Sequence, residues 1–352
     1  MKKLAFVFVI ILSSLFIFTA CDNSIDLTAD YKETTVVYAI FDPGDSISYI
    51  RVTKAFLGNG SIIDMAKVRD SSEYQNISVT LEKYLNKRPV KTFNFEPIEL
   101  DGKEDGIFYS PRHTVYAAVT YNELDCANTR DTVYSYKLQI INNSKDTVGR
   151  NMTLVGGEFV GTTPMPGHDG KPGTISFLYN KISKTTIAWS AVENGYIYGL
   201  DAEFYFLEVF TNGDSIQRTV KWDSIVTVSS GDANVKTEIQ CTKFFDMVLA
   251  QVPYKDSDKE NSVVKRRIGS DVLGDMTFFF KVGTKDFYEY MTIRQLSSGM
   301  NQDIPIYTNV DNGIGLITSR ITHARLFVLT DQAKNTLLDD PDFDHLKFKS
   351  FQ

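Results

Sequence analysis

YSYKLQI, residues 134–140, alternates apolar or aromatic side chains with polar ones. The segment ISVTLEKYL, residues 77–85, shows the same period of two along most of its length. Successive side chains of a β-strand point to opposite faces of the sheet, so this alternation predicts sheets with one buried face. Turn-forming clusters separate these runs at the spacing of a β-sandwich, and they lie at residues 86–89, 101–106 and 142–146. The sequence therefore predicts a mainly β fold.

The second half repeats the strand pattern with larger aromatic side chains. Residues 185–189 form an expected strand that ends on Trp189, and aromatic or aliphatic side chains alternate through residues 196–206. A tryptophan-bearing strand facing an aromatic strand resembles a fibronectin-type sandwich, with Trp189 in its core. Two helices are expected in addition, one capped by Thr242 and one capped by Thr284.

The first 21 residues have the pattern of an export signal. Lys2 and Lys3 precede an apolar run over residues 4–18, which is short for a membrane span. FTAC, residues 18–21, resembles a bacterial lipobox, although phenylalanine stands where leucine is usual. The resemblance implies that Cys21 receives a diacylglycerol and further acylation, and several chains anchor durably because each buried methylene contributes about 0.8 kcal/mol. An ordinary signal peptide and an uncleaved anchor are the alternative interpretations.

The size of the chain favours two domains. Removal of 20 residues from 352 leaves 332, which is more than one hydrophobic core usually supports. The predicted parts are a signal peptide (1–20), a lipidated tether (21–33), an immunoglobulin-like N-terminal β-sandwich (34–155), a linker rich in glycine and proline (156–173) and a fibronectin-like C-terminal β domain with added helices (174–352).

The charge balance excludes some classes of partner. The chain has 37 Lys+Arg and 44 Asp+Glu, and loss of Lys2 and Lys3 leaves 35 minus 44, or −9. Nucleic-acid binding needs clustered positive charge, and a polybasic segment for anionic lipid is also missing from the sequence. The protein is therefore expected to contact a membrane through the lipid on Cys21 and to bind no nucleic acid.

The sequence offers no recognisable catalytic constellation. The four histidines, His113, His168, His323 and His345, have no metal-ligand spacing, and there is no G-x-S-x-G nucleophile motif. DSDKE, residues 256–260, starts like a calcium loop but lacks the glycine and the final acid, so a solvated charge run is favoured. We therefore expect no enzyme activity, no metal and no cofactor, although a hydrolase using two carboxylates stays open.

Two further cysteines remain after Cys21. An exported location permits a disulfide between Cys126 and Cys241, but they fall in different expected domains and no spacing rule brings them together. Two thiols are the alternative.

PIYTNVDNGIGLITSR, residues 305–320, is the most distinctive motif of the chain. Gly313 and Gly315 are expected to supply a tight bend or a close backbone approach beside the amides of Asn309 and Asn312. Together with Tyr307 they form a candidate structural motif, which we favour over a ligand site.

This motif resembles the closing motif of an uncharacterised family of Bacteroidetes lipoproteins, a domain of unknown function. The helix with FYEY (287–290) and the early strands TVVYAIF (35–41) and IRVTKAFL (50–57) resemble the same family. The resemblance implies a lipidated protein with an immunoglobulin-like domain and a second β domain, on the outer membrane near nutrient transporters. It supplies no catalytic residues.

Three functional hypotheses follow from these observations. The leading one is a non-enzymatic accessory or binding protein of a surface uptake assembly, whose partner is an outer-membrane transporter, a surface glycan or another protein. The second is a fimbrial or adhesive subunit, which requires a first strand released by proteolysis. The third is a lipid-anchored hydrolase with carboxylate chemistry.

Overall fold

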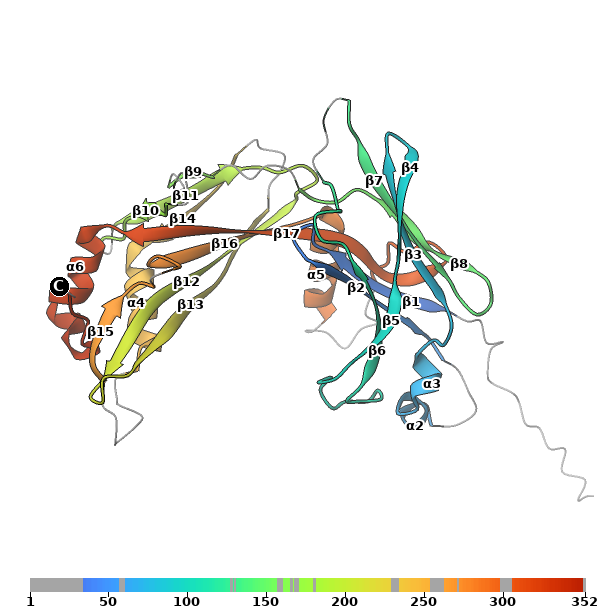
Figure 1. Cartoon of the computed structure of the whole chain (residues 1–352), viewed down its shortest axis with the longest axis horizontal. Helices are drawn as coiled ribbons and strands as arrows, with labels where there is room; N and C mark the ends of the chain where they lie inside the picture. Colours follow the sequence, from blue (N-terminus) through green and yellow to red (C-terminus); the bar gives the residue numbers. More distant parts are fainter. Residues whose placement is uncertain are drawn as a thin grey trace, which may run out of the picture.

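The computed structural model of the chain describes residues 34–350, apart from 57–60, 127–128, 130, 157–160, 165–166, 168–170, 180–181, 229–233, 254–262, 271 and 298–305. The fold is mainly β, as predicted. Two lobes lie side by side and share one long strand, β17 (Gly313–Leu329) (Figure 1). The predicted signal peptide, Cys21 and the predicted tether lie outside the described residues.

The N-lobe consists of two sheets that face each other across one core. The first sheet contains β1 (Thr35–Phe41), β2 (Ile47–Lys54), β6 (His113–Val119) and β5 (Glu96–Leu100), in this order. The second contains β4 (Arg88–Asn94), β3 (Ser78–Leu85), β7 (Tyr134–Ile141) and β8 (Thr147–Met152). Two short helices precede β3, namely α2 (Ile62–Ala66) and α3 (Arg69–Ser72).

The C-lobe also packs two sheets against each other and contains four helical elements among its described residues. One sheet contains β13 (Ser215–Val228), β12 (Ile197–Phe210), β16 (Met276–Gly283), β15 (Val263–Ile268) and β10 (Gly173–Ile175). The other contains β14 (Asn234–Gln240), β11 (Lys184–Ser190) and β9 (Gly161–Thr163). The helical elements are α4 (Cys241–Gln251), α5 (Lys285–Ser297), α6 (Asp331–Asp339) and the 3-10 helix η1 (Pro341–Leu346).

Strand β17 joins the lobes into one 10-stranded sheet. Residues 313–319 pair in parallel with β1, and residues 320–327 pair antiparallel with β16. Val310 and Ile317 consequently pack in the N-lobe core, although the sequence assigned residues 174–352 to the C-terminal domain. Helix α5 lies at the junction of the lobes, beside β17 (Figure 1).

The alternating segments form the strands that the sequence predicts. In β7 the side chains of Tyr136, Leu138 and Ile140 are buried, and those between them are partly exposed. Trp189 is buried in the C-lobe core, as predicted, with its ring 5.2 Å from that of Phe280. Burial of one such aromatic side chain contributes roughly 2–3 kcal/mol, so aromatic packing is a main source of C-lobe stability.

Two details differ from the sequence predictions. Helix α4 begins at Cys241, and its N-cap is Gln240 without a side-chain hydrogen bond, so Thr242 is not the cap. Thr284 does cap α5, because its hydroxyl accepts a hydrogen bond from the Phe287 amide at 3.2 Å. The stretch 156–173, predicted as a linker, contains β9 and the first residue of β10, because both pair with neighbouring strands.

In the part of the chain that the structure describes, no helix is both long and apolar enough to span a membrane.

Candidate binding pocket between the lobes

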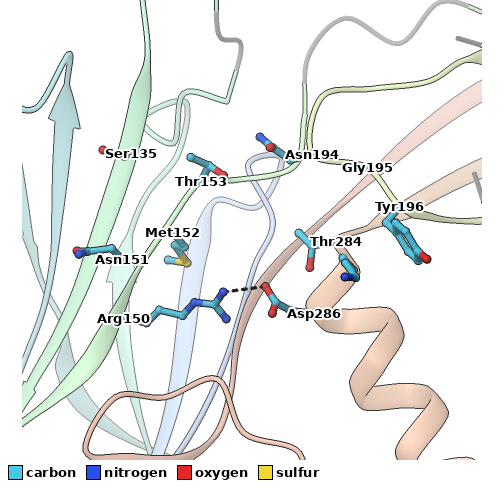
Figure 2. Close-up of a pocket in the computed structure, with 11 residues that line it drawn as sticks. Ser135, Arg150, Asn151, Met152, Thr153, Asn194, Gly195, Tyr196, Thr284 and Asp286 are labelled. Atoms are coloured by element: carbon cyan, nitrogen blue, oxygen red, sulfur yellow. Dashed lines mark ion pairs between the residues drawn. The ribbon is translucent and has the colours of Figure 1, made fainter. Parts of the chain in front are cut away.

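A cavity of about 590 Å³ lies where the two lobes meet. Its lining comes from β7 and β8, from the turn before β12 and from the start of α5, as Figure 2 shows. We call it the interlobe pocket, and its lining residues are Ser135, Arg150, Asn151, Met152, Thr153, Asn194, Gly195, Tyr196, Thr284, Lys285 and Asp286.

An ion pair crosses this pocket from one lobe to the other. Nη2 of Arg150 on β8 lies 3.1 Å from Oδ2 of Asp286 on α5 (Figure 2). The hydroxyl of Tyr307 donates to Oδ1 of Asp286 at 2.8 Å. Burial alone would raise the pKa of Asp286, but the hydrogen bonds from Tyr307 and Arg150 outweigh it and hold the pKa below its ordinary value. Asp286 is therefore a fixed carboxylate and not a proton donor at neutral pH.

Arg150 keeps hydrogen-bonding capacity beyond this pair. Its Nη1 atom is buried and has no hydrogen-bond partner among the described residues. A guanidinium carries five N–H donors, and an unpaired buried donor costs free energy that an acceptor on a ligand would recover.

A tight turn builds the wall on the C-lobe side. Asn194 adopts a left-handed backbone with φ of 58°, and its side-chain amide donates to the Leu154 carbonyl at 3.0 Å. The backbone at Gly195 passes so near its neighbours that an added Cβ would lie 2.5 Å from the Tyr198 hydroxyl. The turn places the ring of Tyr196 beside that of Tyr288, with centroids 5.2 Å apart. Asparagine tolerates the left-handed backbone at position 194, and only glycine avoids the close contact at position 195, which explains the Asn-Gly sequence of this turn.

The lining suits recognition of a polar, uncharged ligand. It offers amides, hydroxyls and one tyrosine ring, and its single carboxylate and its arginine neutralise each other. The other lining cation, Lys285, pairs with Glu289 of the same helix at 3.4 Å. Such donors and acceptors match a molecule with several hydroxyl groups. A glycosidase needs two carboxyl groups across the bond to be cleaved, whereas Asp286 is the one carboxylate among the described lining residues. Within the described residues, no group of three His, Cys, Asp or Glu could hold a metal ion.

The motif near the C-terminus is brought together at the start of β17. The Asn309 side chain bonds the Ile317 backbone twice, accepting from its amide at 2.9 Å and donating to its carbonyl at 2.9 Å. Asn312 supplies the bend, with φ of 57°, and donates to the Thr147 carbonyl at 3.1 Å. Gly313 and Gly315 belong to the strand, and an added Cβ at Gly315 would lie 2.0 Å from the Val37 carbonyl oxygen.

This motif therefore provides a close backbone approach, while the bend is at Asn312. Tyr307 and Asn309 reach the interlobe pocket through hydrogen bonds to Asp286 and not as lining residues.

The structure corrects the candidate disulfide, because Cys126 and Cys241 are both thiols. Cys126 packs against the N-lobe core, whereas Cys241 is buried in the C-lobe core, 3.3 Å from the Thr185 hydroxyl. The two cores lie in different lobes, and a disulfide requires Cα atoms within about 7 Å. Cys21 lies outside the described residues.

Most of the pocket leaves no signal in the sequence. Arg150 and Asp286 carry no signal of their own, since each is one charge in an ordinary polar segment. The Asn194-Gly195 pair is a recognisable turn signal, but its position beside a cavity depends on tertiary structure.

Fold and site together define a class, a two-lobed β protein with a polar pocket at the junction of its lobes. Comparison with known proteins does not narrow this class, because no protein-family model matches the chain and no curated protein matches it either.

Proposed function

We propose that the protein is a lipid-anchored, non-enzymatic binding protein of the outer membrane that supports a surface nutrient-uptake assembly. The interlobe pocket carries this proposal, because its one carboxylate is paired on both oxygens and its other polar groups suit binding. The ligand is a neutral molecule with several hydroxyl groups, such as an oligosaccharide. The resemblance to Bacteroidetes lipoproteins supports the membrane address and the transporter as partner.

The ligand is tested by titration calorimetry on the mature lipidated chain in detergent. The probes are neutral gluco-, xylo- and galacto-oligosaccharides. We expect at least one series to bind, and Tyr196→Ala to weaken that binding about fivefold, because an aromatic contact contributes roughly 1 kcal/mol. The matched control is Tyr121→Ala, which removes a tyrosine that is 60% exposed and outside the pocket lining. Absence of binding in all series, or equal losses in both variants, would contradict the proposed ligand class.

The anchor is tested separately by Cys21→Ser. We expect this variant to leave the membrane fraction and to take up no labelled palmitate, because the acyl chains supply the attachment. Membrane retention of the variant would contradict lipidation at Cys21.

The partner is tested by pull-down of tagged protein from its own membranes in mild detergent, with surface protease accessibility measured in the same cells. Recovery with a transporter supports the uptake role. Recovery as a ladder of itself would favour the adhesive subunit. That alternative requires β1 to leave the sheet, although β1 is paired on both edges and buries Val37, Ala39 and Phe41.

A further inference from the structure

A second cavity, of about 730 Å³, lies on the N-lobe against the face of β1 and β2 that points away from the sandwich core. Helix α2, the loop of residues 101–112 and helix α5 form its other walls. We call it the cationic groove and define it by the basic residues Arg51, Lys54, Lys103 and Arg294 and the aromatic residues Tyr38 and Phe108.

Basic side chains from three separate elements converge on this groove. Arg51 and Lys54 come from β2, Lys103 from the loop before β6, and Arg294 from α5. The pKa of Lys103 is lowered, first by burial and then by the charge of Arg51. The pKa of His113 is lowered by burial, by Arg51 and by Lys103, in that order. The charge of Glu73 acts in the opposite direction on both groups. Four basic side chains against this one lining carboxylate still give the groove a local positive charge, although the whole chain carries a net charge of −7.

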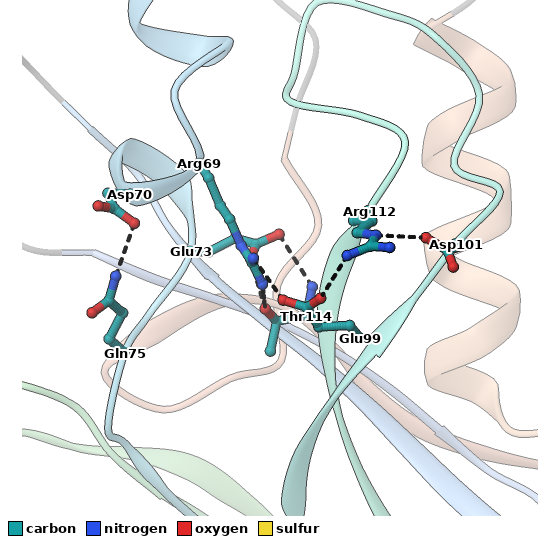
Figure 3. A network of polar contacts seen from close by, with 8 residues as sticks. All are labelled: Arg69, Asp70, Glu73, Gln75, Glu99, Asp101, Arg112 and Thr114. Carbon is teal, nitrogen blue, oxygen red and sulfur yellow. Dashed lines mark hydrogen bonds and ion pairs between the residues drawn. The ribbon is translucent and has the colours of Figure 1, made fainter.

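The acidic residues nearby are already paired with other arginines (Figure 3). Glu73 accepts from Nε of Arg69 at 2.7 Å and from the Thr114 hydroxyl at 2.7 Å. Nη1 of Arg69 also lies 2.6 Å from Oε1 of Glu99. Arg112 pairs in turn with Asp101 at 3.0 Å.

This pairing leaves three basic residues of the groove without acidic partners. Among the described residues, no carboxylate forms an ion pair with Arg51, Lys54 or Lys103. Glu73, the acid that lines the groove, is directed to Arg69 and Thr114.

Aromatic rings form the remaining walls. Tyr38 and Tyr290 meet edge to face, with centroids 6.3 Å apart. Nζ of Lys103 lies 5.7 Å from the ring centre of Phe108, whose side chain is 51% exposed. An exposed ring beside an ammonium group can pack against a flat ligand while the charge binds an acid.

We propose that the cationic groove binds an organic anion whose carboxylate or sulfonate group is attached to a ring. The acid pairs with Arg51 and Lys103, and the ring packs between Tyr38 and Phe108. An aromatic acid and a uronic-acid sugar share this chemistry. The groove is separate from the interlobe pocket, so either site can be tested without the other.

The test is calorimetric titration of the mature lipidated chain with two anions and their neutral counterparts. The first pair is naphthalene-2-sulfonate and naphthalen-2-ylmethanol, and the second is digalacturonate and its methyl ester. We expect at least one anion to bind about tenfold more tightly than its neutral counterpart, because a hydrogen bond between charged groups is stronger than one between neutral groups. The affinity should fall severalfold between about 50 and 500 mM NaCl, since salt screens partly exposed charges.

The variant that tests the site is Arg51→Gln, with Arg88→Gln as its control. Arg88 is exposed on β4, outside the groove lining, so both variants remove one positive charge from the N-lobe. We expect Arg51→Gln to weaken anion binding about tenfold and Arg88→Gln to leave it unchanged. Equal unfolding temperatures of the two variants establish that the loss is local.

The outcomes separate the two ligand sources. Binding of naphthalene-2-sulfonate alone assigns an aromatic acid, and binding of digalacturonate alone assigns an acidic sugar. Neither anion binding, equal binding of a neutral counterpart, or equal losses in the two variants would overturn the proposal. Arg51→Gln should not change the binding of neutral oligosaccharides at the interlobe pocket. A negative result at the cationic groove would therefore leave the proposed function of the interlobe pocket unaffected.

Discussion

Arg266 and Arg51 lie in strands of the same 10-stranded sheet, yet their surroundings are opposite. Arg266, on β15 of the C-lobe, is 3% exposed, and its Nε and Nη2 donate to Oε1 of Glu208 at 3.0 and 2.8 Å. Its Nη1 donates to the Leu346 carbonyl at 2.7 Å. Arg51, on β2 of the N-lobe, is partly exposed and has no side-chain ion pair or hydrogen bond among the described residues.

This difference separates two uses of the same side chain. A guanidinium whose N–H groups all donate to protein acceptors holds the segments that carry those acceptors together. Arg266 joins β12 to the C-terminal segment in this way. A guanidinium without an acid keeps its charge available for a ligand. Arg150 and Arg69 lie between these extremes, with side chains 27% and 33% exposed. The four arginines therefore predict a graded series of stability effects.

The largest effect is expected for Arg266→Ala. Removal of one partner leaves Glu208 buried without its main counter-ion, which typically costs about 3–5 kcal/mol. Arg218 would retain its contact with Oε2 of Glu208 at 2.9 Å, so the loss of unfolding free energy should lie toward the lower end of this range. The free energy of unfolding in urea measures it, with Arg88→Ala as a surface control. A loss below about 1 kcal/mol would show that this pair is not needed for stability.

The next effect is expected for Arg150→Gln, which removes the ion pair between the lobes. The pair is partly buried, so we expect a loss of roughly 1–2 kcal/mol. Asp286 would keep the hydrogen bond from Tyr307, and this limits the cost. Urea unfolding of the variant, compared with Arg88→Gln, measures the difference. An unchanged stability would indicate that this ion pair does not help to hold the lobes together.

The same pair predicts a pH dependence. The pKa of Asp286 lies below its ordinary value of 3.8 in the folded protein, so its stabilising contribution is present above pH 3.8 and is lost as the pH falls through the folded pKa. The stability difference between the native protein and Arg150→Gln should therefore be constant from about pH 6 to 8 and shrink below about pH 4. A difference that does not shrink at all as the pH falls below 3.8 would mean that Arg150 stabilises the fold by packing and not by charge.

Features of the fold that depend on neighbouring residues could be predicted from the sequence, whereas those that depend on contacts between distant segments could not. The strands at residues 77–85 and 134–140 follow from local alternation, and the structure confirms them. Trp189 was also placed correctly, because a large aromatic residue in a strand has few alternatives to the core. Strand β17 was not predicted as a bridge, since its parallel pairing with β1 joins opposite ends of the chain.

The candidate sites were harder to predict for the same reason. Arg51, Lys103 and Arg294 meet only because a strand, a loop and a helix from distant segments fold together. Nothing in the neighbours of Arg51 in the sequence reveals that the nearby acids are paired elsewhere. The motif around Gly315 was recognised, but its reason is tertiary, because any Cβ at this position would come within 2.0 Å of the Val37 carbonyl oxygen on β1.

A smaller effect is expected for Arg69→Gln. Its ion pairs with Glu73 and Glu99 are partly exposed, so the loss of stability should be about 1 kcal/mol or less. The released Glu73 would then compete with a bound anion for Lys103. We therefore expect anion binding in the cationic groove to weaken a fewfold, as measured by titration with naphthalene-2-sulfonate or digalacturonate, whichever binds. Unchanged affinity would mean that the Glu73 side chain keeps its orientation, away from Lys103, without the ion pair to Arg69.

The smallest effect on stability is expected for Arg51→Gln. No acid loses a partner and no buried donor is created, so the free energy of unfolding should change by less than about 0.5 kcal/mol. Removal of one charge from the groove should also relieve its repulsion with Lys103, whose pKa the Arg51 charge helps to lower. Titration of the Lys103 amine by NMR should show its pKa rising in the variant. A destabilisation comparable to that of Arg266→Ala would place Arg51 among the structural arginines and would remove the contrast on which the cationic groove rests.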